Sequence, residues 1–419
     1  MPKVSPNHIY DFVSQFETGD VAVAFSGGGD STALLHMLKG HPRVTHAFII
    51  DHNLRAGSAD EAAQAADMAR ELGYQVTVKM WEHGGVTSGL QARAREFRYG
   101  AMGQMCRAAG ITHLLTGHTR DDQAETVLMR KARDTGWRGL AGMALSSYAP
   151  IWPQLAGVYL HRPLLAMTRE QLREYNRAQG LSWVEDPSNE NTDFTRIKAR
   201  AELGGDIDLS EKLLDVQKRN RARLGDEAAL LGAWLERFAV IHDHGYVTAH
   251  KPPPEALLGP LLRAASGTGG PIETAKLAMV QAKLAEPDFT ALTLAGAWIV
   301  KKEDGFLFTR DMAAVKPRGG QEGLKLIELQ TGEPYLWDGR FMVRAATADV
   351  TVRPALGQIE AMTKQSTCQD ILALPKEVRP TLPVFGRKGA YIGFGAGLWN
   401  GLDVTACHSR RLLERFKAR

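Results

Sequence analysis

The sequence predicts a doubly wound parallel α/β domain, followed by a mainly helical middle domain and a small α+β domain. Three observations carry this prediction. Short apolar runs alternate with helical stretches through the first half of the chain, a glycine-rich loop directly follows the first run, and the pattern changes around residues 200–210. Strands and helices that alternate at this spacing form βαβ units, whose parallel sheet is covered by helices on both faces.

The α/β domain is expected over residues 1–205. Four runs have the length and the β-branched or aromatic content of strands, namely VAVAF (21–25), THAFII (45–50), QVTVKMW (75–81) and ITHLL (111–115). The segments between them carry apolar residues at helical spacing, and several end in glycine. A further strand and helix are expected over 157–165 and 168–180. Ligands bind such sheets beyond the carboxyl ends of the strands, where the strand order changes direction.

The middle and C-terminal domains are expected over 206–318 and 324–419. Residues 210–241 have the pattern of one long helix, and residues 291–311 that of a hairpin turning at Glu303, Asp304 and Gly305. The segment KPRGGQEG (316–323) has the composition of a linker. Strand-like pieces then occur around 335–337, 340–345 and 391–394.

Composition limits the class of protein. Hydrophobic residues make up 44% and charged residues 23% of the 419 residues, which is ordinary globular composition. No apolar run approaches the ~18 residues of a membrane helix and the N-terminus lacks a hydrophobic signal segment, so we expect a cytoplasmic protein without a membrane partner. The net charge of +4 and the basic segment 408–419 allow a polyanionic partner, but a solvated basic face explains them equally well.

The glycine-rich loop SGGGDS (26–31) follows the first expected strand and opens the next helix. Glycines let backbone N–H groups approach phosphate oxygens, and a helix N-terminus adds partial positive charge. The spacing fits neither a Walker loop nor a dinucleotide fold. Asp30 cannot neutralise phosphate itself, so we expect it to hold Mg²⁺ that bridges phosphates. The expected nucleotide-binding residues of the loop are Ser26, Gly27, Gly28, Gly29, Asp30 and Ser31.

Polar residues also follow the second and third expected strands. In DHNLR (51–55), Arg55 offers a forked donor to phosphate and Asp51 can bond the ligand or orient the loop, so both are expected to contact the nucleotide. Taken alone, this segment is equally typical of a strand-end turn. On the expected helix over 91–99, Arg93, Arg95 and Arg98 form either a face that contacts phosphate or a solvated surface.

The segment GHTRDDQAET (117–126) follows the fourth expected strand. If a helix begins near His118, then His118, Asp121, Asp122 and Glu125 share one face at i, i+3, i+4 and i+7. Three carboxylates on one stripe repel one another unless a cation lies among them, and the candidates are Mg²⁺ and an ammonium substrate. A structural zinc site is disfavoured without cysteine. The alternative is a capped surface helix with acidic residues in its first turn.

Together these motifs, with QARAREFRY (91–99), RPLL (162–165) and WVEDPSNENTDFTRIKAR (183–200), resemble the tRNA(Ile)-lysidine synthetase family of PP-loop ATP pyrophosphatases, which have a Rossmann-like fold. The resemblance is dense over the first 200 residues and looser in LPKEVRPTLPVF (374–385). Two positions depart from the family pattern. Asp134 stands where the family has glycine, and Ile197 stands where it has asparagine after Arg196.

The resemblance implies a ligase that uses ATP, Mg²⁺, free L-lysine and tRNA(Ile) with a CAU anticodon. In the implied reaction the wobble cytidine is adenylated at its 2-carbonyl oxygen with release of diphosphate. The lysine amine then displaces AMP to give lysidine, which converts AUG to AUA decoding. The middle and C-terminal domains are expected to bind the tRNA, because they alone are large enough to distinguish it from methionine tRNA. A homodimer is a further expectation.

The resemblance also implies roles for individual residues. Asp122, with Asp121 as the second candidate, binds the lysine ammonium groups, because carboxylates select a substrate with two cationic amines. Arg196 stabilises charge at the α-phosphate during transfer. His118 is a candidate by position for the base that deprotonates the attacking amine.

Three other functions are compatible with parts of this sequence pattern. A tRNA cytidine thiolase would use similar ATP chemistry, but it needs paired cysteines, and Cys106, Cys368 and Cys407 are far apart in the sequence. A synthetase that uses free ammonia would leave the basic C-terminal half without an evident purpose. A non-catalytic tRNA-binding relative would be expected to lose Asp30 or the carboxylates of 117–126, all of which are present.

Overall fold

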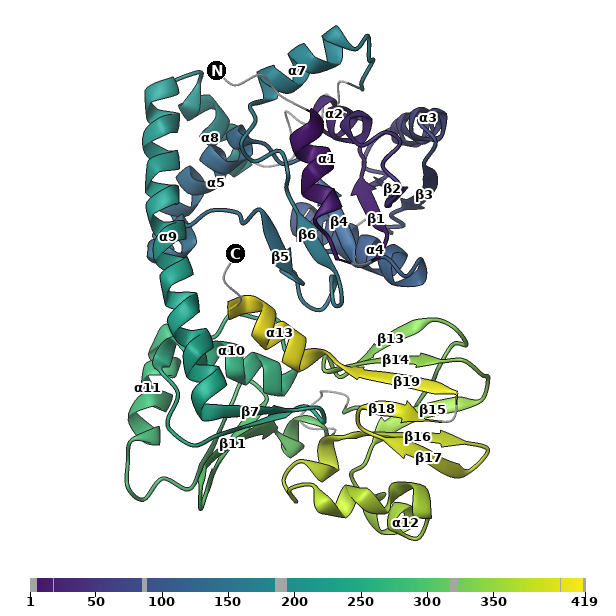
Figure 1. Ribbon diagram of the computed structural model, residues 1–419, viewed down its shortest axis with the longest axis vertical. Helices are drawn as coiled ribbons and strands as arrows, with labels where there is room; N and C mark the ends of the chain where they lie inside the picture. The colour runs from purple at the N-terminus through teal and green to yellow at the C-terminus, as the bar shows by residue number, and fades with distance from the viewer. Residues whose placement is uncertain are drawn as a thin grey trace. The chain divides into compact units, whose positions relative to one another are not determined.

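The computed structural model describes residues 6–17, 19–84, 89–184, 194–316, 323–399 and 401–416. The chain forms two compact units, Met1–Asp226 and Glu227–Arg419, whose elements are labelled in Figure 1. None of the helices in the described ranges is both long and apolar enough to cross a membrane.

The first unit is built on a six-stranded sheet with the strand order β3-β2-β1-β4-β6-β5. All neighbouring strands are parallel except β5 and β6. The four strands expected before residue 116 and the one expected over 157–165 are confirmed. The strand β5 was missed by the sequence pattern because Ser-Ser-Tyr has no apolar alternation. The strands are β1 (Val21–Ala24), β2 (Val44–Asp51), β3 (Gln75–Met80), β4 (His113–Thr116), β5 (Ser146–Tyr148) and β6 (Tyr159–His161).

Helices cover both faces of this sheet, which confirms the doubly wound class. One face packs against α1, α2, α3 and α7 around Leu34, Leu35 and Ile49. The other packs against α4 around Met102, Cys106 and further apolar side chains. The helices are α1 (Pro6–Ser14), α2 (Gly29–Met37), α3 (Ser58–Glu71), α4 (Leu90–Ala108), α5 (Arg120–Ala132), α6 (Gly136–Leu140), α7 (Arg169–Ala178) and α8 (Phe194–Leu203).

The helices α5, α8 and the first part of α9 (Ile207–Phe238) share a separate small core that contains Val127, Leu128, Ala199 and Leu214. This core fixes the N-terminal end of α5, where the acidic motif lies. The expected helix over 210–241 ends earlier than predicted, at Phe238. Residues 239–242 instead pair with residues 246–249 as a hairpin, because Val240 and Ile241 are β-branched and fit a pleated strand.

The second unit contains three antiparallel sheets, with the orders β7-β8-β11-β10-β9, β12-β15-β16-β17 and β13-β14-β19-β18. The helices α10 and α11 share a core with the five-stranded sheet, and the two four-stranded sheets share another. The expected hairpin over 291–311 is confirmed as β10 and β11, and the three expected strand-like pieces are confirmed as β13, β14 and β17. Most of the expected linker, residues 317–322, lies outside the described residues.

The strands of this unit are β7 (Ala239–His242), β8 (Tyr246–Ala249), β9 (Ala291–Leu294), β10 (Ala297–Lys302), β11 (Gly305–Arg310), β12 (Ile327–Glu328), β13 (Pro334–Trp337), β14 (Phe341–Ala345), β15 (Val350–Pro354), β16 (Pro383–Arg387), β17 (Ala390–Phe394), β18 (Gly397–Trp399) and β19 (Leu402–Ala406). Its helices are α10 (Glu255–Ser266), α11 (Thr274–Leu284), α12 (Ile359–Thr363) and α13 (Cys407–Phe416).

Candidate active site

The strand order of the first unit brings two motifs together. The strand β1 lies between β2 and β4. The helix α2, which joins β1 to β2, packs on one face of the sheet, and α4, which leads into β4, packs on the other. The loop after β1 and the loop after β4 therefore meet at the point where ligands of doubly wound sheets bind. A Cβ atom added at Gly117 would lie 3.2 Å from the backbone nitrogen of Ser31, so glycine permits this close approach.

The loop SGGGDS is held in shape by its own groups. Gly27 has φ of +77°, a left-handed conformation that favours glycine. The Ser31 hydroxyl donates to the carbonyl of Gly28 at 2.9 Å, and the Thr32 hydroxyl donates to the carbonyl of Gly27 at 3.2 Å. The hydroxyls of Ser26 and Ser31 lie 3.2 Å apart. The first N–H groups of α2 have no intrahelical partner, so this loop presents donors suited to phosphate.

A distant segment completes the support of the loop. Asn176 of α7 is fully buried and donates from Nδ2 to the carbonyl of Gly29 at 2.9 Å. The backbone nitrogen of Val184 donates to the carbonyl of Gly27 at 2.9 Å. These bonds come from outside the motif, so α7 and the residues after it fix the direction of the loop carbonyls.

The carboxylates of the loop and of α5 converge on one guanidinium, that of Arg169 at the start of α7. Its Nη2 lies 2.5 Å from Asp122 Oδ1, its Nη1 lies 2.8 Å from Glu125 Oε1 and its Nε lies 3.7 Å from Asp30 Oδ2. The backbone nitrogen of Arg169 also donates to Asp121 Oδ2 at 2.9 Å. The sequence pattern predicted Mg²⁺ or an ammonium substrate among these carboxylates, with a capped helix carrying acidic residues in its first turn as the alternative. The chain itself places the guanidinium of Arg169 there, and α5 does have a capped N-terminus with Asp121 and Asp122 in its first turn.

The N-terminus of α5 differs from the expected one. The helix begins at Arg120 with Thr119 as its N-cap, so His118 lies before the helix and not on its acidic face. His118 Nδ1 lies 2.8 Å from the hydroxyl of Thr116. Asp122 closes a capping box, since its Oδ2 accepts from the backbone nitrogen of Thr119 at 2.7 Å and from its hydroxyl at 2.8 Å. Asp122 is thus engaged on both carboxylate oxygens.

The electrostatics of the two aspartates are opposite. Burial, and then the nearby charge of Asp122, raise the pKa of Asp30 to about 6. Burial alone would also raise the pKa of Asp122, but Arg169, His118 and the bonds from Thr119 hold it below its usual range. Asp30 is therefore the carboxylate that gains most from an additional cation.

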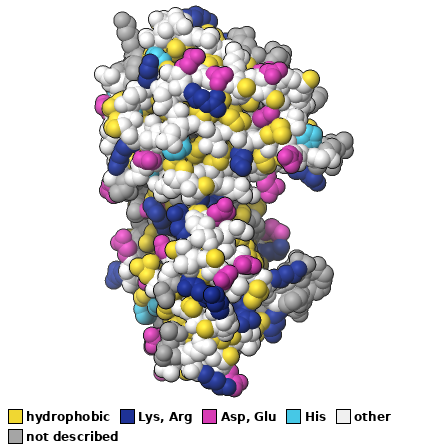
Figure 2. Space-filling view, turned by 90° about the vertical axis from the view of Figure 1, so that its right-hand side faces the viewer, with side chains coloured by type: hydrophobic (Ala, Val, Ile, Leu, Met, Phe, Trp, Pro, Cys, Tyr) yellow, Lys and Arg dark blue, Asp and Glu magenta, His cyan; other side chains and the backbone are white. Residues whose placement is uncertain are grey.

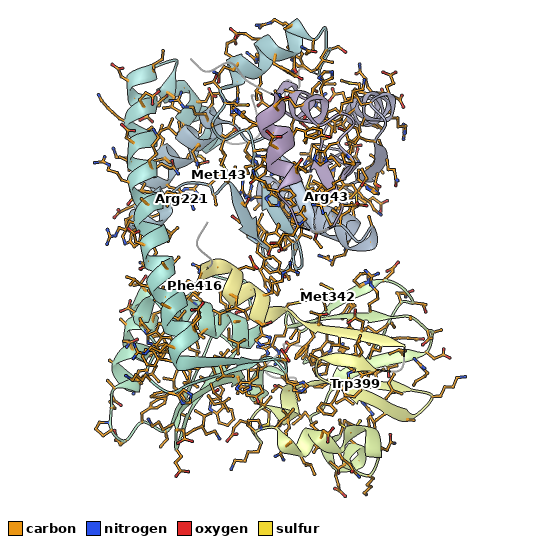
Figure 3. The ribbon with its side chains drawn as sticks, viewed as in Figure 1. Arg43, Met143, Arg221, Met342, Trp399 and Phe416 are labelled. Carbon is orange, nitrogen blue, oxygen red and sulfur yellow. The ribbon has the colours of Figure 1, made fainter. Side chains whose placement is uncertain are left out.

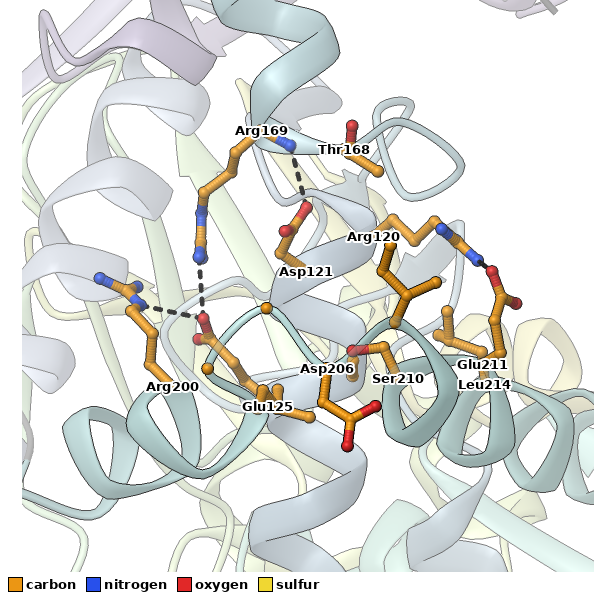
Figure 4. A pocket seen from close by; sticks show the side chains of 15 residues that line it. Arg120, Asp121, Glu125, Thr168, Arg169, Arg200, Asp206, Ser210, Glu211 and Leu214 are labelled. Carbon is orange, nitrogen blue, oxygen red and sulfur yellow. Dashed lines mark hydrogen bonds and ion pairs between the residues drawn. The ribbon is translucent and has the colours of Figure 1, made fainter. Parts of the chain in front are cut away.

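A cleft with a volume of about 220 Å³ opens beside this network, between α5, α7, α8 and the start of α9 (Figure 4). Asp121, Glu125, Arg169 and Arg200 line it. The Glu125 side chain is 1% exposed, and its Oε1 also accepts from Arg200 Nε at 3.0 Å. Its Oε2 is buried without a hydrogen-bond partner in the described residues. The cleft thus combines carboxylates with guanidinium groups, as an amino acid ligand requires.

The residues expected at the end of β2 have internal partners. Asp51 is buried, and its Oδ1 accepts from the backbone nitrogen of Asn53 at 2.8 Å. This bond supports the positive φ of Asn53, +50°. Arg55 pairs with Glu61 of α3 at 2.6 Å. Contact of Asp51 and Arg55 with a nucleotide stays a prediction.

The remaining expectations concern Arg196 and the two departures from the family pattern. Arg196 and Ile197 lie in α8, but their side chains are outside the described residues. Asp134 adopts φ of +47°, the left-handed conformation that glycine takes most easily. Aspartate tolerates this conformation better than most residues that carry a side chain.

Arg169 and Asn176 are the site residues that sequence reasoning missed. Their helix was expected over 168–180, and Thr168 and Gln171 at its start have the spacing of a capping box. The surplus of carboxylates in 117–126 signalled that a cation was needed, but spacing along the chain cannot show which of the many arginines approaches.

The fold and site define a class of protein, the PP-loop nucleotide enzymes. The family model described as a PP-loop domain matches residues 2–207. In this class a glycine-rich loop after the first strand faces the switch point of a parallel sheet, as the loop 26–31 does here.

The relatives of the whole chain define the particular family. A tRNA(Ile)-lysidine synthase from Brucella anthropi is 33% identical over 362 residues, covering 81% of this chain and 77% of its own length. One from Ruegeria pomeroyi is 32% identical over 420 residues, covering 96% of this chain and 91% of its own length. The chain belongs to the tRNA(Ile)-lysidine synthase family.

Proposed function

We propose that this protein ligates free L-lysine to the wobble cytidine of tRNA(Ile) with a CAU anticodon. In the first step the 2-carbonyl oxygen of cytosine attacks the α-phosphate of ATP, and diphosphate leaves. In the second step the lysine amine attacks carbon 2 of the activated ring, loses a proton and expels AMP. The product lysidine changes the decoding of the tRNA from AUG to AUA.

The nucleotide end of the site is assigned to the loop 26–31. The backbone N–H groups at the start of α2 would hold the phosphates of ATP, with the hydroxyls of Ser26 and Ser31 beside them. Asp30 would hold Mg²⁺, which neutralises phosphate charge when it is bound. The raised pKa of Asp30, about 6, supports this assignment because a buried carboxylate beside Asp122 favours a cation. Asp51 and Arg55 would contact the nucleotide from the end of β2.

The lysine end of the site is assigned to the cleft beside α5. Asp121 lines this cleft, whereas both carboxylate oxygens of Asp122 already accept hydrogen bonds or ion pairs. Asp121 would therefore meet a lysine ammonium group directly, and Asp122 would act through Arg169. The free Oε2 of the buried Glu125 is a second acceptor for that substrate. Arg200 would face the lysine carboxylate.

The remaining assignments are expectations from the sequence. That of Arg196 follows from the family resemblance, and that of His118 from its position alone. Arg196 would stabilise the α-phosphate during transfer, and His118 would accept the proton of the amine. The regions 206–318 and 324–419 would bind the body of the tRNA, and we expect the protein to work as a homodimer in the cytoplasm.

The observation that carries the proposal is the convergence of Asp30, Asp121, Asp122 and Glu125 on Arg169 at the switch point. The decisive test is incorporation of radiolabelled lysine into an unmodified tRNA(Ile) transcript with a CAU anticodon. ATP and Mg²⁺ are present, and methionine tRNA is the control. Label must enter the isoleucine transcript alone. Diphosphate release without label would leave the PP-loop chemistry but reject lysine as the nucleophile.

Substitution of Asp30 tests its role in the first step of the reaction. Asp30→Asn should lower diphosphate release at least ~10³-fold, about 4 kcal/mol in the barrier, because phosphate charge loses its metal-bound partner. Asp60→Asn is the matched control, since Asp60 is an exposed aspartate in the first turn of α3. Diphosphate release by Asp30→Asn at the rate of the control would contradict the role of Asp30.

The thiolase alternative is not favoured. The three cysteines are buried, and burial raises the pKa of Cys106 to about 12, so this thiol is not a reactive thiolate.

A further inference from the structure

Four arginines of the first unit lie near one another, and three of them bond carbonyl oxygens of residues 139–144, the end of α6 and the loop that follows it toward β5. They come from four different elements, and none belongs to the acidic network of Arg169. They are Arg95 of α4, Arg130 of α5, Arg162 directly after β6 and Arg221 of α9. We refer to them as the arginine cluster.

Two of these side chains each bond two carbonyl oxygens of residues 139–144. Arg130 Nη1 donates to Gly139 at 2.8 Å and to Gly142 at 3.1 Å. Arg221 Nη2 donates to Ala141 at 2.6 Å and to Gly142 at 3.0 Å. Figure 3 labels Arg221 on α9 and Met143 on the loop beside it. A guanidinium has five N–H donors, so each keeps donors that the loop does not use.

Arg162 is the most buried member, at 8% exposure. Its Nη1 donates to the carbonyl of Ala144 at 2.9 Å, but its Nε is buried without a hydrogen-bond partner in the described residues. An unpartnered donor on a buried cation is costly, since it loses hydration and gains no acceptor. Such a group is suited to an acceptor that is not among the described residues, such as the oxygen of an anionic ligand.

The charges of the cluster are not balanced within the described part of the chain. Burial, and then the positive charges of Arg95, Arg221 and Arg130, lower the pKa of Arg162, with only Tyr99 acting in the other direction. Burial and a neighbouring arginine also lower the pKa of Arg130 and of Arg221. No carboxylate forms an ion pair with any of the four among the described residues. Figure 2, in contrast, shows acidic and basic side chains interspersed over the face that it presents.

The cluster lies at the edge of the sheet where the active site lies. Arg162 follows β6, which runs parallel to β4 with Leu115 opposite His161. The hydroxyl of Thr116 donates to the carbonyl of His161 at 3.1 Å, so Arg162 leaves the sheet beside the loop 117–119. A bound anion here would be a neighbour of the reacting groups.

Aromatic side chains accompany the arginines. The guanidinium carbon of Arg95 lies 4.9 Å from the ring centroid of Tyr99. On α6, directly before the loop, Trp137 carries the guanidinium of Arg223 at 4.0 Å. Tyr99 is buried, at 2% exposure, and Trp137 also carries Arg138 at 4.5 Å, so these rings pack against guanidinium groups and do not offer a free face to a base. The role left to this region is contact with phosphate through its guanidinium groups.

We propose that the arginine cluster binds backbone phosphates of the RNA strand that carries the target base. This inference rests on the proposed function, because it assumes an RNA substrate. The forked donors of arginine match phosphate oxygens, and contacts of this kind set the position of the strand without reading its sequence. The phosphates of ATP have their own donors at the loop 26–31, so the cluster serves the second polyanion of the reaction.

The test measures binding of a CAU anticodon stem-loop RNA to the full chain at several salt concentrations, together with ATP binding in the absence of RNA. The variants are Arg95→Gln, which breaks no bond to the loop 139–144, and Arg221→Gln. Each should weaken RNA binding about 5–10-fold and reduce the slope of log K against log salt by about 0.7 per lost phosphate contact. ATP affinity should not change. Arg70→Gln is the matched control, because Arg70 is an exposed helical arginine paired with Asp67.

Each outcome decides a separate point. An unchanged salt slope in both variants would overturn the inference, since a merely structural role in the loop moves affinity but not the number of released counterions. Loss of ATP affinity would assign the cluster to the nucleotide and overturn it as well. Lysine incorporation by the wild-type chain is measured alongside. Its absence would reject the proposed function, whereas normal incorporation with unaffected RNA binding by the variants would reject the arginine cluster alone.

Discussion

The first unit contains two clusters of charged side chains, and their charges are compensated in different ways. The acidic network places Asp30, Asp122 and Glu125 around Arg169, so the chain supplies its own counter-ion. The arginine cluster gathers four cations, of which three bond backbone carbonyls of residues 139–144, and none forms an ion pair with a carboxylate among the described residues. Carbonyl dipoles satisfy donors, but they do not cancel charge.

The difference indicates which charged side chains stabilise the folded chain and which are compensated only when a ligand binds. Removing one partner from a buried and balanced pair leaves an uncompensated charge, which costs several kcal/mol. Removing one member from a cluster of like charges relieves repulsion. The free energy of unfolding of single variants should therefore distinguish the two clusters in the absence of substrate.

The largest effect is expected for Arg169→Gln. It removes the cation shared by Asp122 and Glu125, and Glu125, whose side chain is 1% exposed, keeps only its bond to the half-exposed Arg200. The free energy of unfolding should therefore fall by about 3 kcal/mol, the lower end of the cost of breaking a buried ion pair. Urea unfolding measures this change. The control is Arg177→Gln on the same helix, because Arg177 and Glu170 form an exposed pair worth at most about 0.5 kcal/mol.

The double variant Arg169→Gln, Glu125→Gln sharpens the same prediction. Removal of the buried carboxylate should recover part of the loss, because the uncompensated charge disappears together with its partner. Additive losses in the double variant would show that Arg169 does not act through the charge of Glu125.

An intermediate effect is expected from the pH dependence of Asp30. Its pKa in the folded chain is about 6, against the ordinary value of 3.8. Between these values the folded chain binds more protons than the unfolded chain, so stability falls as pH rises from about 4 to about 6 and changes little above. The contribution is about 1–2 kcal/mol, and Asp30→Asn should remove it and stabilise the protein at pH 7. Thermal unfolding of both chains across this range measures it, and parallel pH profiles would refute the assignment.

The smallest effect is expected for Arg95→Gln. The substitution removes one exposed charge that repels Arg162, so the free energy of unfolding should stay constant or rise by at most about 0.5 kcal/mol. A loss of more than 1 kcal/mol would mean that Arg95 has a structural partner and would remove the contrast with Arg169. Urea unfolding at low ionic strength is the appropriate measurement, because salt screens exposed charges.

The sequence alone was sufficient for the fold class and for the two motifs of the switch point. Apolar runs of strand length, helical spacing between them and the loop 26–31 are local patterns, and each reports on a few consecutive residues. The failures were local too. The helix predicted to residue 241 ended at Phe238, and the helix expected near His118 began at Arg120, because a threonine cap and β-branched residues decide helix ends.

The sequence by itself determined the phosphate loop and the excess of carboxylates in 117–126, and that excess predicted a cation among those carboxylates. Only the tertiary structure decided which cation that is, because α7 brings Arg169 from 47 positions beyond Asp122. The arginine cluster has the same origin, since its members come from four elements separated along the chain. The interaction of two charges depends on the distance between them in the folded chain. Spacing along the sequence does not predict this distance for residues that lie on different helices and strands.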